Sequence, residues 1–197
     1  AGMKSATATL GKVPFELSEH AGKVAIVVGT DGAEKTGLPK DSGAIPIGED
    51  ATSLIFLHAS ARPATTRPGW ALLWDQDDTA DLLGWYEVIY EDGFVTTIPL
   101  RYGVNIGEWN WASRRSEWDY CYGADAVLLG GQRENPITFF AFEWKNPRLG
   151  KGITEVRLKG TTGFRGAAPQ GFSGNYGPVI PKNAVILKAI SVVKKRD

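Results

Sequence analysis

The chain has 197 residues, of which 43% are hydrophobic and 22% are charged, an ordinary balance for a globular protein. Its 22 Lys and Arg residues balance its 22 Asp and Glu residues. This zero net charge argues against nucleic-acid binding by phosphate neutralisation and against an anionic membrane surface as the partner. No apolar run approaches the roughly 20 residues that a membrane-spanning helix needs, so membrane insertion is not expected.

Short runs of β-branched and aromatic residues follow one another along the chain. Strands are expected over 24–28 (VAIVV) and 53–59 (SLIFLHA), and then over 85–90 and 94–100 on either side of Glu91-Asp92-Gly93. An Asp-Gly pair between two alternating runs is a strong hairpin signal. Further strands are expected over 137–145, 153–158 and 185–193.

The chain is rich in turn residues, with 24 glycines and 11 prolines between these runs. Many short strands with such punctuation are typical of an antiparallel β-sandwich or jelly roll. We therefore predict an all-β fold, with residues 1–197 in a single sandwich domain and a poorly ordered N-terminus over about residues 1–10.

The most unusual stretch is 105–122 (NIGEWNWASRRSEWDYCY), which mixes large rings with many charges. A core strand would not contain so many charges, and a solvated loop would not normally contain so many rings. Apolar rings with a polar rim suit a binding surface, and a sugar offers both an apolar C–H face and hydroxyl groups. The alternative is a long loop that folds onto its own domain, with its aromatic side chains buried against one another for packing alone.

In the binding interpretation, the rings are stacking platforms and the charged groups orient the ligand. Ionised side chains make the stronger hydrogen bonds to vicinal hydroxyls, although the same charges could equally form surface ion pairs of little energetic value. The candidate ligand-binding residues of this stretch are Trp109, Trp111, Trp118, Tyr120, Arg114, Glu117 and Asp119.

A second aromatic patch lies in RPGWALLWDQDD, where Trp70 and Trp74 are further candidates for ligand binding or for the core. The same segment begins the densest acidic cluster, and calcium favours carboxylate oxygens. The candidate calcium ligands are Asp75, Asp77 and Asp78, followed by Asp81. Their spacing does not match an EF-hand loop, because a tyrosine, Tyr86, would occupy the twelfth position.

Other cofactor and catalytic motifs are lacking in the sequence. Cys121 is the one cysteine, which excludes an internal disulfide and a multi-cysteine zinc site. His20 and His58 are far apart, which makes zinc binding unexpected, and His58 in the apolar run is expected to be a satisfied core histidine. We therefore expect no cofactor, with a structural calcium ion left open.

Several segments in a fixed order resemble a known class of domains. They are PFEL (14–17), GAIPIG (43–48), SLIFLHAS (53–60), YEVIYEDGFVTTIPLRYGVNI (86–106), FEWKNPRLGKGITEVRL (142–158) and VILKAISV (185–192). From about residue 13 to residue 193 the chain resembles the galactose-binding-like β-sandwich domains that accompany bacterial glycoside hydrolases. The resemblance implies a jelly roll, a carbohydrate-associated and usually non-catalytic role, neighbouring domains of a polysaccharide-degrading protein, an extracellular or periplasmic location, and often a structural calcium ion.

These observations predict a non-catalytic carbohydrate-binding module that binds an oligosaccharide or polysaccharide through the aromatic loop. One alternative is a glycoside hydrolase that uses two carboxylates among Glu108, Glu117 and Asp119. A polysaccharide lyase could use Tyr120, Arg114 or His58 in the same patch. A further alternative is a protein-interaction domain with the same patch as its hot spot.

Overall fold

The computed structural model describes residues 5–10, 13–18, 25–30, 37–61, 82–110, 121, 123–132, 135–161 and 184–194. Within these ranges the regular secondary structure is entirely β, and no helix occurs. The strands are β1 (Ser5–Leu10), β2 (Val13–Ser18), β3 (Ile26–Gly29), β4 (Ile45–Glu49), β5 (Ser53–Ala61), β6 (Leu82–Tyr90), β7 (Val95–Arg101), β8 (Asp125–Gln132), β9 (Asn135–Lys145), β10 (Ile153–Gly160) and β11 (Ala184–Val193).

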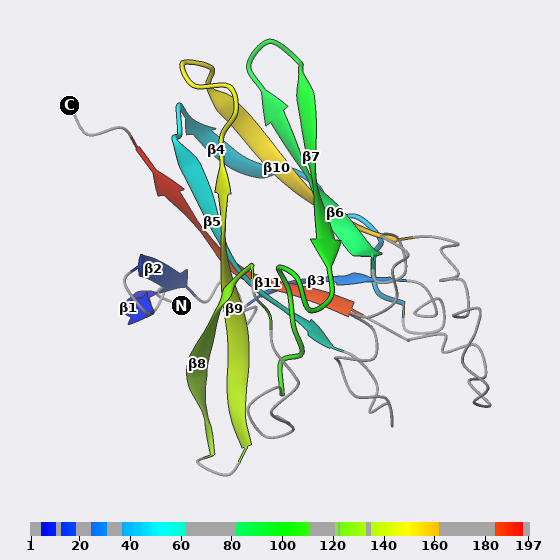
Figure 1. Cartoon of the computed structure of the whole chain (residues 1–197). Coiled ribbons are helices and arrows are strands. Elements are labelled where there is room, and N and C mark those ends of the chain that lie inside the picture. Colours follow the sequence, from blue (N-terminus) through cyan, green and yellow to red (C-terminus); the bar gives the residue numbers. More distant parts are fainter. Residues whose placement is uncertain are drawn as a thin grey trace.

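The strands form two larger sheets and one separate hairpin (Figure 1). One sheet has the order β4-β10-β6-β7, the other has the order β3-β11-β5-β9-β8, and β1 pairs with β2. Every strand pair is antiparallel. The predicted all-β sandwich of antiparallel sheets is thus confirmed.

The main core lies between the two sheets and follows from side-chain alternation. On β6, Tyr86, Val88 and Tyr90 are buried in this core, whereas the alternate residues of the strand are less buried. Because successive side chains of a strand point to opposite faces, one period-2 pattern supplies both a core face and an outer face. Phe56 from β5 stacks on Tyr86 from β6 with ring centroids 4.1 Å apart, which joins the sheets at their centre.

A second apolar cluster lies on the outer face of the five-stranded sheet. Leu57 and Ala59 of β5 are buried there together with Phe139 of β9. The β1–β2 hairpin lies beside this sheet (Figure 1) and contributes Phe15, which is completely buried in the cluster. Strand β5 is therefore covered on both faces, which explains why residues 53–60 are all buried and why apolar residues follow one another without alternation over 54–57 (LIFL).

The expected Asp-Gly hairpin is confirmed as the β6–β7 turn, where Ile89 pairs with Val95 and Gly93 has a φ of 81°. That positive φ is the left-handed backbone conformation that glycine adopts without strain. The structure also contains strands that were not expected, namely β1, β2, β4 and β8. Strand β1 lies within the terminal segment for which we expected poor order.

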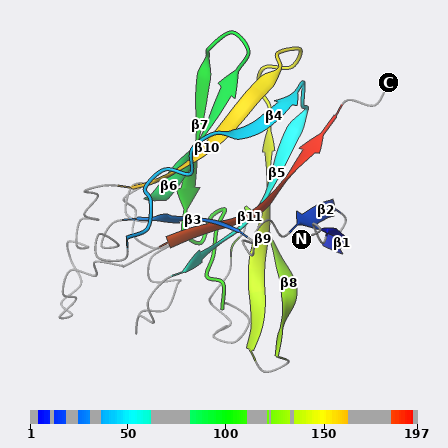
Figure 2. The ribbon, with the colours of Figure 1, turned by 180° about the vertical axis from the view of Figure 1, so that it is seen from behind.

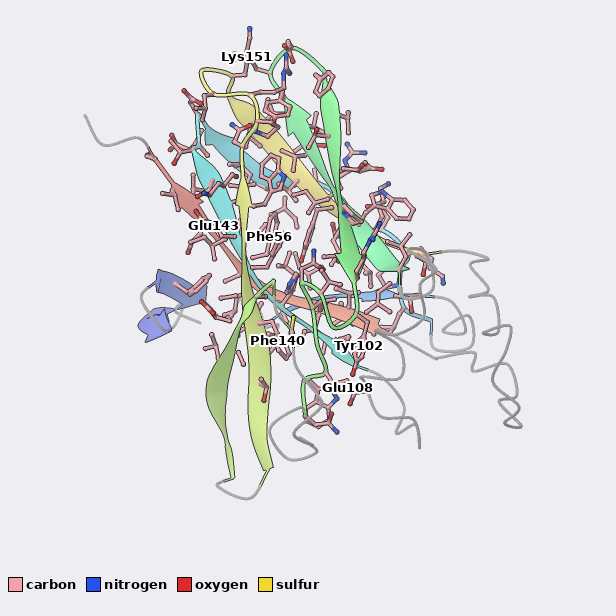
Figure 3. All side chains as sticks on the ribbon, viewed as in Figure 1. Phe56, Tyr102, Glu108, Phe140, Glu143 and Lys151 are labelled. Atoms are coloured by element: carbon pink, nitrogen blue, oxygen red, sulfur yellow. The ribbon has the colours of Figure 1, made fainter. Side chains whose placement is uncertain are left out.

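The two ends of the molecule are formed by different connections. The β6–β7 hairpin lies at one end and the β8–β9 hairpin at the other, as both views show (Figures 1 and 2). Tyr102 and Glu108, which follow β7, lie toward the β8–β9 end, and Lys151 lies at the β6–β7 end (Figure 3). The segment that begins the aromatic stretch is thus at the end opposite the Asp-Gly turn.

Candidate functional site

Trp109 is the predicted ligand-binding residue that lies within the described part of the chain. Its side chain is 39% exposed, although the two residues before it are buried. The remaining candidates lie outside the described residues: Trp111, Arg114, Glu117, Trp118, Asp119 and Tyr120 of the aromatic stretch, Trp70 and Trp74 of the second patch, and the acidic residues Asp75, Asp77, Asp78 and Asp81.

The backbone of Trp109 is fixed on both sides by strands of the five-stranded sheet. Its N–H donates to the carbonyl of Ser60 at 2.9 Å, and its carbonyl accepts from the N–H of Thr138 at 2.7 Å. The N–H of Ser60 in turn donates to the carbonyl of Gly107 at 2.8 Å. Residues 107–109 are therefore held between the end of β5 and β9, and a parallel bridge joins Ser60 to Glu108.

Gly107 is required for this close approach. Strands β5 and β9 pair as far as His58 and Phe140, and residues 107–109 continue the sheet from that point. A Cβ atom at Gly107 would lie 2.4 Å from the ring of Phe140, closer than real Cβ contacts allow. The absence of a side chain thus lets the segment pack directly on the aromatic ring.

Asn105 closes the turn that leads from β7 into this segment. Its side-chain oxygen accepts from the N–H of Arg101 at 2.9 Å, and its amide nitrogen donates to the carbonyl of Pro99 at 2.9 Å. Asn105 is itself buried, so these bonds satisfy main-chain groups that little water could reach. The side chain therefore fixes the path of the chain toward Trp109.

His58 connects this turn to the core. Its Nε2 lies 2.8 Å from the carbonyl oxygen of Asn105, and its Nδ1 lies 2.9 Å from the hydroxyl of Tyr86. A carbonyl can only accept, so Nε2 bears the proton, and Nδ1 accepts from the Tyr86 O–H. The expectation of a satisfied core histidine is confirmed.

The burial of His58 also determines its charge. Its side chain is completely buried, and loss of hydration lowers its pKa from 6.5 to about 4, although the bond to the Asn105 carbonyl acts in the opposite direction. The imidazole is therefore neutral at physiological pH. A completely buried ring with both nitrogens engaged is unsuited to the acid–base role that the lyase alternative would give it.

The end of the aromatic stretch returns to the same turn. The N–H of Gly123 donates to the carbonyl of Val104 at 2.6 Å, and the thiol of Cys121 donates to the same oxygen at 3.3 Å. Burial raises the pKa of Cys121 to about 12, so the thiol is not a nucleophile at neutral pH. Val104 directly precedes the stretch 105–122, and Cys121 and Gly123 lie at its other end. These hydrogen bonds therefore hold the two ends of the stretch together.

Glu108, the first carboxylate of the glycosidase alternative, is 6% exposed. Within the described ranges, no group of three or more His, Cys, Asp or Glu side chains is arranged to hold a metal ion. The same part of the chain contains no helix long and apolar enough to cross a membrane.

Comparisons with family models, with curated proteins and with solved structures give no match to this chain.

Proposed function

We propose that the protein is a non-catalytic carbohydrate-binding module and that the end of the sandwich bearing Trp109 contacts the glycan. The observation that supports this most directly is an indole that is 39% exposed on a backbone fixed at both its N–H and its carbonyl. A partly exposed ring on a fixed backbone, beside a stretch rich in further rings and charges, is what a sugar-binding surface requires.

A ring on a fixed backbone suits a sugar for energetic reasons. Stacking of a nucleic-acid base on an aromatic side chain contributes about 1–3 kcal/mol, and a sugar face should lie near the lower limit. Because the backbone that bears the ring is already ordered, less conformational freedom is lost on binding and more of this small energy becomes affinity. Anchoring by Asn105 and Gly107 therefore supports the proposal as much as the ring itself does.

One ring alone supports at most millimolar affinity, and micromolar affinity requires two or three. Within the proposal, Trp111, Trp118 and Tyr120 supply the further rings, and Arg114, Glu117 and Asp119 bind hydroxyl groups. The wider proposal includes a galactose-binding-like jelly roll, an extracellular or periplasmic location, and neighbouring domains in a polysaccharide-degrading protein. Trp70 and Trp74 are proposed as outlying contacts, and Asp75, Asp77 and Asp78 as ligands of a structural calcium ion.

The proposal is tested by affinity electrophoresis through gels that contain soluble polysaccharides: mixed-linkage β-glucan, arabinoxylan, galactomannan and polygalacturonate. Trp109→Ala should weaken the retardation of the protein at least about fivefold, which corresponds to about 1 kcal/mol of lost stacking. Phe94→Ala is the matched control, because Phe94 is a large ring, 49% exposed, at the opposite end of the molecule.

The outcomes separate the three functional classes. Retardation that Trp109→Ala reduces and Phe94→Ala leaves unchanged supports the module. Release of new reducing ends from a retained polysaccharide would make the protein an enzyme and direct attention to Glu108, Glu117 and Asp119. No retardation in any gel, together with self-association in sedimentation velocity, would favour the protein-interaction alternative.

A further inference from the structure

Strand β7 forms one edge of the four-stranded sheet, and no strand in the described part of the chain lies beyond it (Figure 1). The N–H of Tyr90 donates to the carbonyl of Phe94, so alternate residues from Phe94 onward direct their main-chain groups toward β6. The residues between them direct theirs outward. The N–H and carbonyl groups of Val95 and Thr97 are therefore two donors and two acceptors that face away from the sheet.

The rest of this edge is closed at both ends. Beyond residue 98, the amide of Asn105 bonds to the carbonyl of Pro99 and the N–H of Arg101, and Pro99 itself has no N–H to offer. Before residue 94, the chain turns toward β6 at Gly93, whose N–H bonds within the turn. The open edge thus consists of residues 94–98, between a tight turn and an asparagine side chain.

This edge lacks the features that protect the other edge strands. Strand β4 contains Pro46 and Gly48, the latter with a φ of 68°, and the register of β8 with β9 is irregular. At β3, the N–H of Gly29 donates to the carbonyl of Pro39, in a segment that lies alongside. Residues 94–98 (FVTTI) contain no charge, proline or glycine and pair with β6 without interruption. Natural proteins normally blunt such an edge, so one left flat and uncharged indicates a pairing site.

The same edge exposes apolar side chains. Phe94 is 49% exposed and Val95 is 46% exposed, and they are two of the four large apolar side chains that are exposed among the described residues. The ring of Phe94 is held in place, because its centroid lies 6.1 Å from that of Tyr90 and 4.4 Å from the guanidinium of Arg148. The open edge therefore combines unpaired main-chain groups with ordered apolar surface.

A second copy of the chain fits this edge in one register. When two β7 strands pair antiparallel with Thr96 on a twofold axis, Val95 of each copy lies opposite Thr97 of the other, and all the outward groups are used. Moving the axis by one residue would place Val95 opposite Pro99, which has no N–H, or Thr97 opposite Gly93, whose N–H is already bonded. The hydrogen-bonding groups thus select the axis at Thr96.

The two closed ends of the edge are complementary in this arrangement. Pro99 of one copy lies opposite Gly93 of the other, which has no side chain. The second copy turns away from the edge at Gly93, at the level where Asn105 begins to fill it, whereas a foreign strand that continued straight would meet Asn105. Symmetric pairing brings no like charges together, and it places the β-branched Val95 beside Thr97, a stabilising type of cross-strand pair.

We propose that the protein forms a twofold dimer through β7, in which two four-stranded sheets join into one antiparallel sheet of eight strands. This inference goes beyond the proposed function and does not depend on it. The interface is at the small end of those known, so a dissociation constant on the order of 100 µM is expected. The polysaccharide gels use the protein well below this concentration and therefore report the monomer.

The first test is sedimentation equilibrium of the whole chain from about 10 µM to about 1 mM. Thr97→Pro removes an outward N–H and leaves the bonds to β6, since Pro99 already occupies an equivalent outward position of the strand. Thr97→Val keeps the N–H and the branched shape and is the matched control. The wild type and Thr97→Val should dimerise alike, and Thr97→Pro should weaken the dimer at least about tenfold.

The second test reads the register by cysteine cross-linking in a Cys121→Ala background. Two Thr96→Cys residues would face each other across the axis with Cα atoms about 4.5 Å apart, within the range of a disulfide. Val95→Cys and Thr97→Cys would meet their own copies only diagonally, at about 7–8 Å, so Thr96→Cys should form the covalent dimer fastest.

The third test needs no variant, so it does not depend on any substituted chain being folded. In the wild-type protein, amide exchange of Val95 and Thr97 should slow as the concentration rises, because the dimer bonds both N–H groups.

Four results would overturn the proposal. They are a monomer at about 1 mM, a dimer that Thr97→Pro leaves intact, fastest cross-linking at Val95→Cys or Thr97→Cys, and a mass that grows beyond the dimer, since a twofold interface is closed. Concentration-dependent protection of Val95 and Thr97 together with rapid cross-linking of Thr96→Cys would support it.

Discussion

At each end of the sandwich, a buried asparagine side chain bonds to main-chain groups of the connecting segments. The core residues that contact the two asparagines are different. At the Trp109 end, buried Asn105 closes a turn by bonding to the N–H of Arg101 and the carbonyl of Pro99. At the β6–β7 end, buried Asn146 accepts from the N–H of Arg148 at 2.9 Å and donates to the carbonyl of Ala51 at 2.8 Å. In both places a side-chain amide takes the role that a strand partner has elsewhere in the sheet.

The partners that join these asparagines to the core are different. The carbonyl of Asn105 accepts from His58, whereas the side-chain oxygen of Asn146 accepts from the hydroxyl of Tyr90 at 2.6 Å. A histidine can gain a charge in acid and a tyrosine cannot. His58 would take up that proton at Nδ1, on the side of Tyr86, because its Nε2 already donates to the carbonyl of Asn105. The two buried asparagines are therefore joined to core residues that differ in their response to acid.

The largest expected effect is loss of either amide. Asn105→Ala would leave two main-chain groups without partners, each costing about 1–3 kcal/mol, so the free energy of unfolding should fall by about 4 kcal/mol in urea denaturation. Asn146→Ala should cost a similar amount. Only Asn105→Ala should also weaken retardation in a polysaccharide gel at a temperature where both variants are folded. Equal binding by the two variants would break the proposed link between Asn105 and Trp109.

Acid should destabilise the protein through His58. The pKa of this residue is about 4 in the folded protein and about 6.5 in the unfolded chain, so the unfolded state binds more protons between these values. The contribution of neutral His58 is complete above pH 6.5 and is lost as the pH falls to 4, by about 3 kcal/mol in total. Urea denaturation from pH 7.5 to 4 measures this loss, and His58→Gln should flatten the curve. An unchanged slope in that variant would show that other groups are responsible.

A smaller effect is expected where the chain packs most closely at the Trp109 end. Gly107→Ala places a methyl group against the ring of Phe140. Overpacking of this kind costs about 1–3 kcal/mol, and the segment 107–109 should move away from Ser60. Gly93→Ala is an instructive contrast at the other end, since its Cβ meets no atom within 4 Å and the cost comes from a φ of 81° alone. Amide exchange of Trp109 should therefore accelerate in Gly107→Ala and not in Gly93→Ala.

A strand or turn could be predicted from the sequence where the pattern that indicates it lies in neighbouring residues. The β6–β7 hairpin was predicted because its alternation and its Asp-Gly turn are written in consecutive residues. Strand β4 was missed because Pro46 and Gly48 read as turn residues, although a strand at the edge of a sheet tolerates them. The β1–β2 hairpin was missed because its position depends on Phe15 meeting an apolar cluster far along the chain.

In the candidate site, too, the residue with a local signal was predicted and the residues that depend on distant contacts were not. Trp109 was identified from the composition of residues 105–122, and its exposure agrees with a ring available for contact. The supports of that ring were not predicted, because His58 and Asn105 are 47 residues apart and no local pattern joins them. The surroundings of Trp85 could not be predicted either, because only the register of three strands shows which charged residues lie beside it.

The smallest expected effect concerns the ion pair at the β6–β7 end. Arg148 binds both carboxylate oxygens of Asp92, at 3.0 and 2.8 Å, and its guanidinium lies 4.4 Å from the ring centroid of Phe94. The hydrogen bonds from Arg148 hold the pKa of Asp92 well below its usual range. Both side chains remain accessible to water, which competes for the same bonds. Asp92→Asn should therefore leave the urea midpoint of unfolding unchanged within error, in contrast to Asn146→Ala in the same turn region. A large loss of stability in Asp92→Asn would mean that the stacked guanidinium, and not the buried amide, holds this end of the sandwich together.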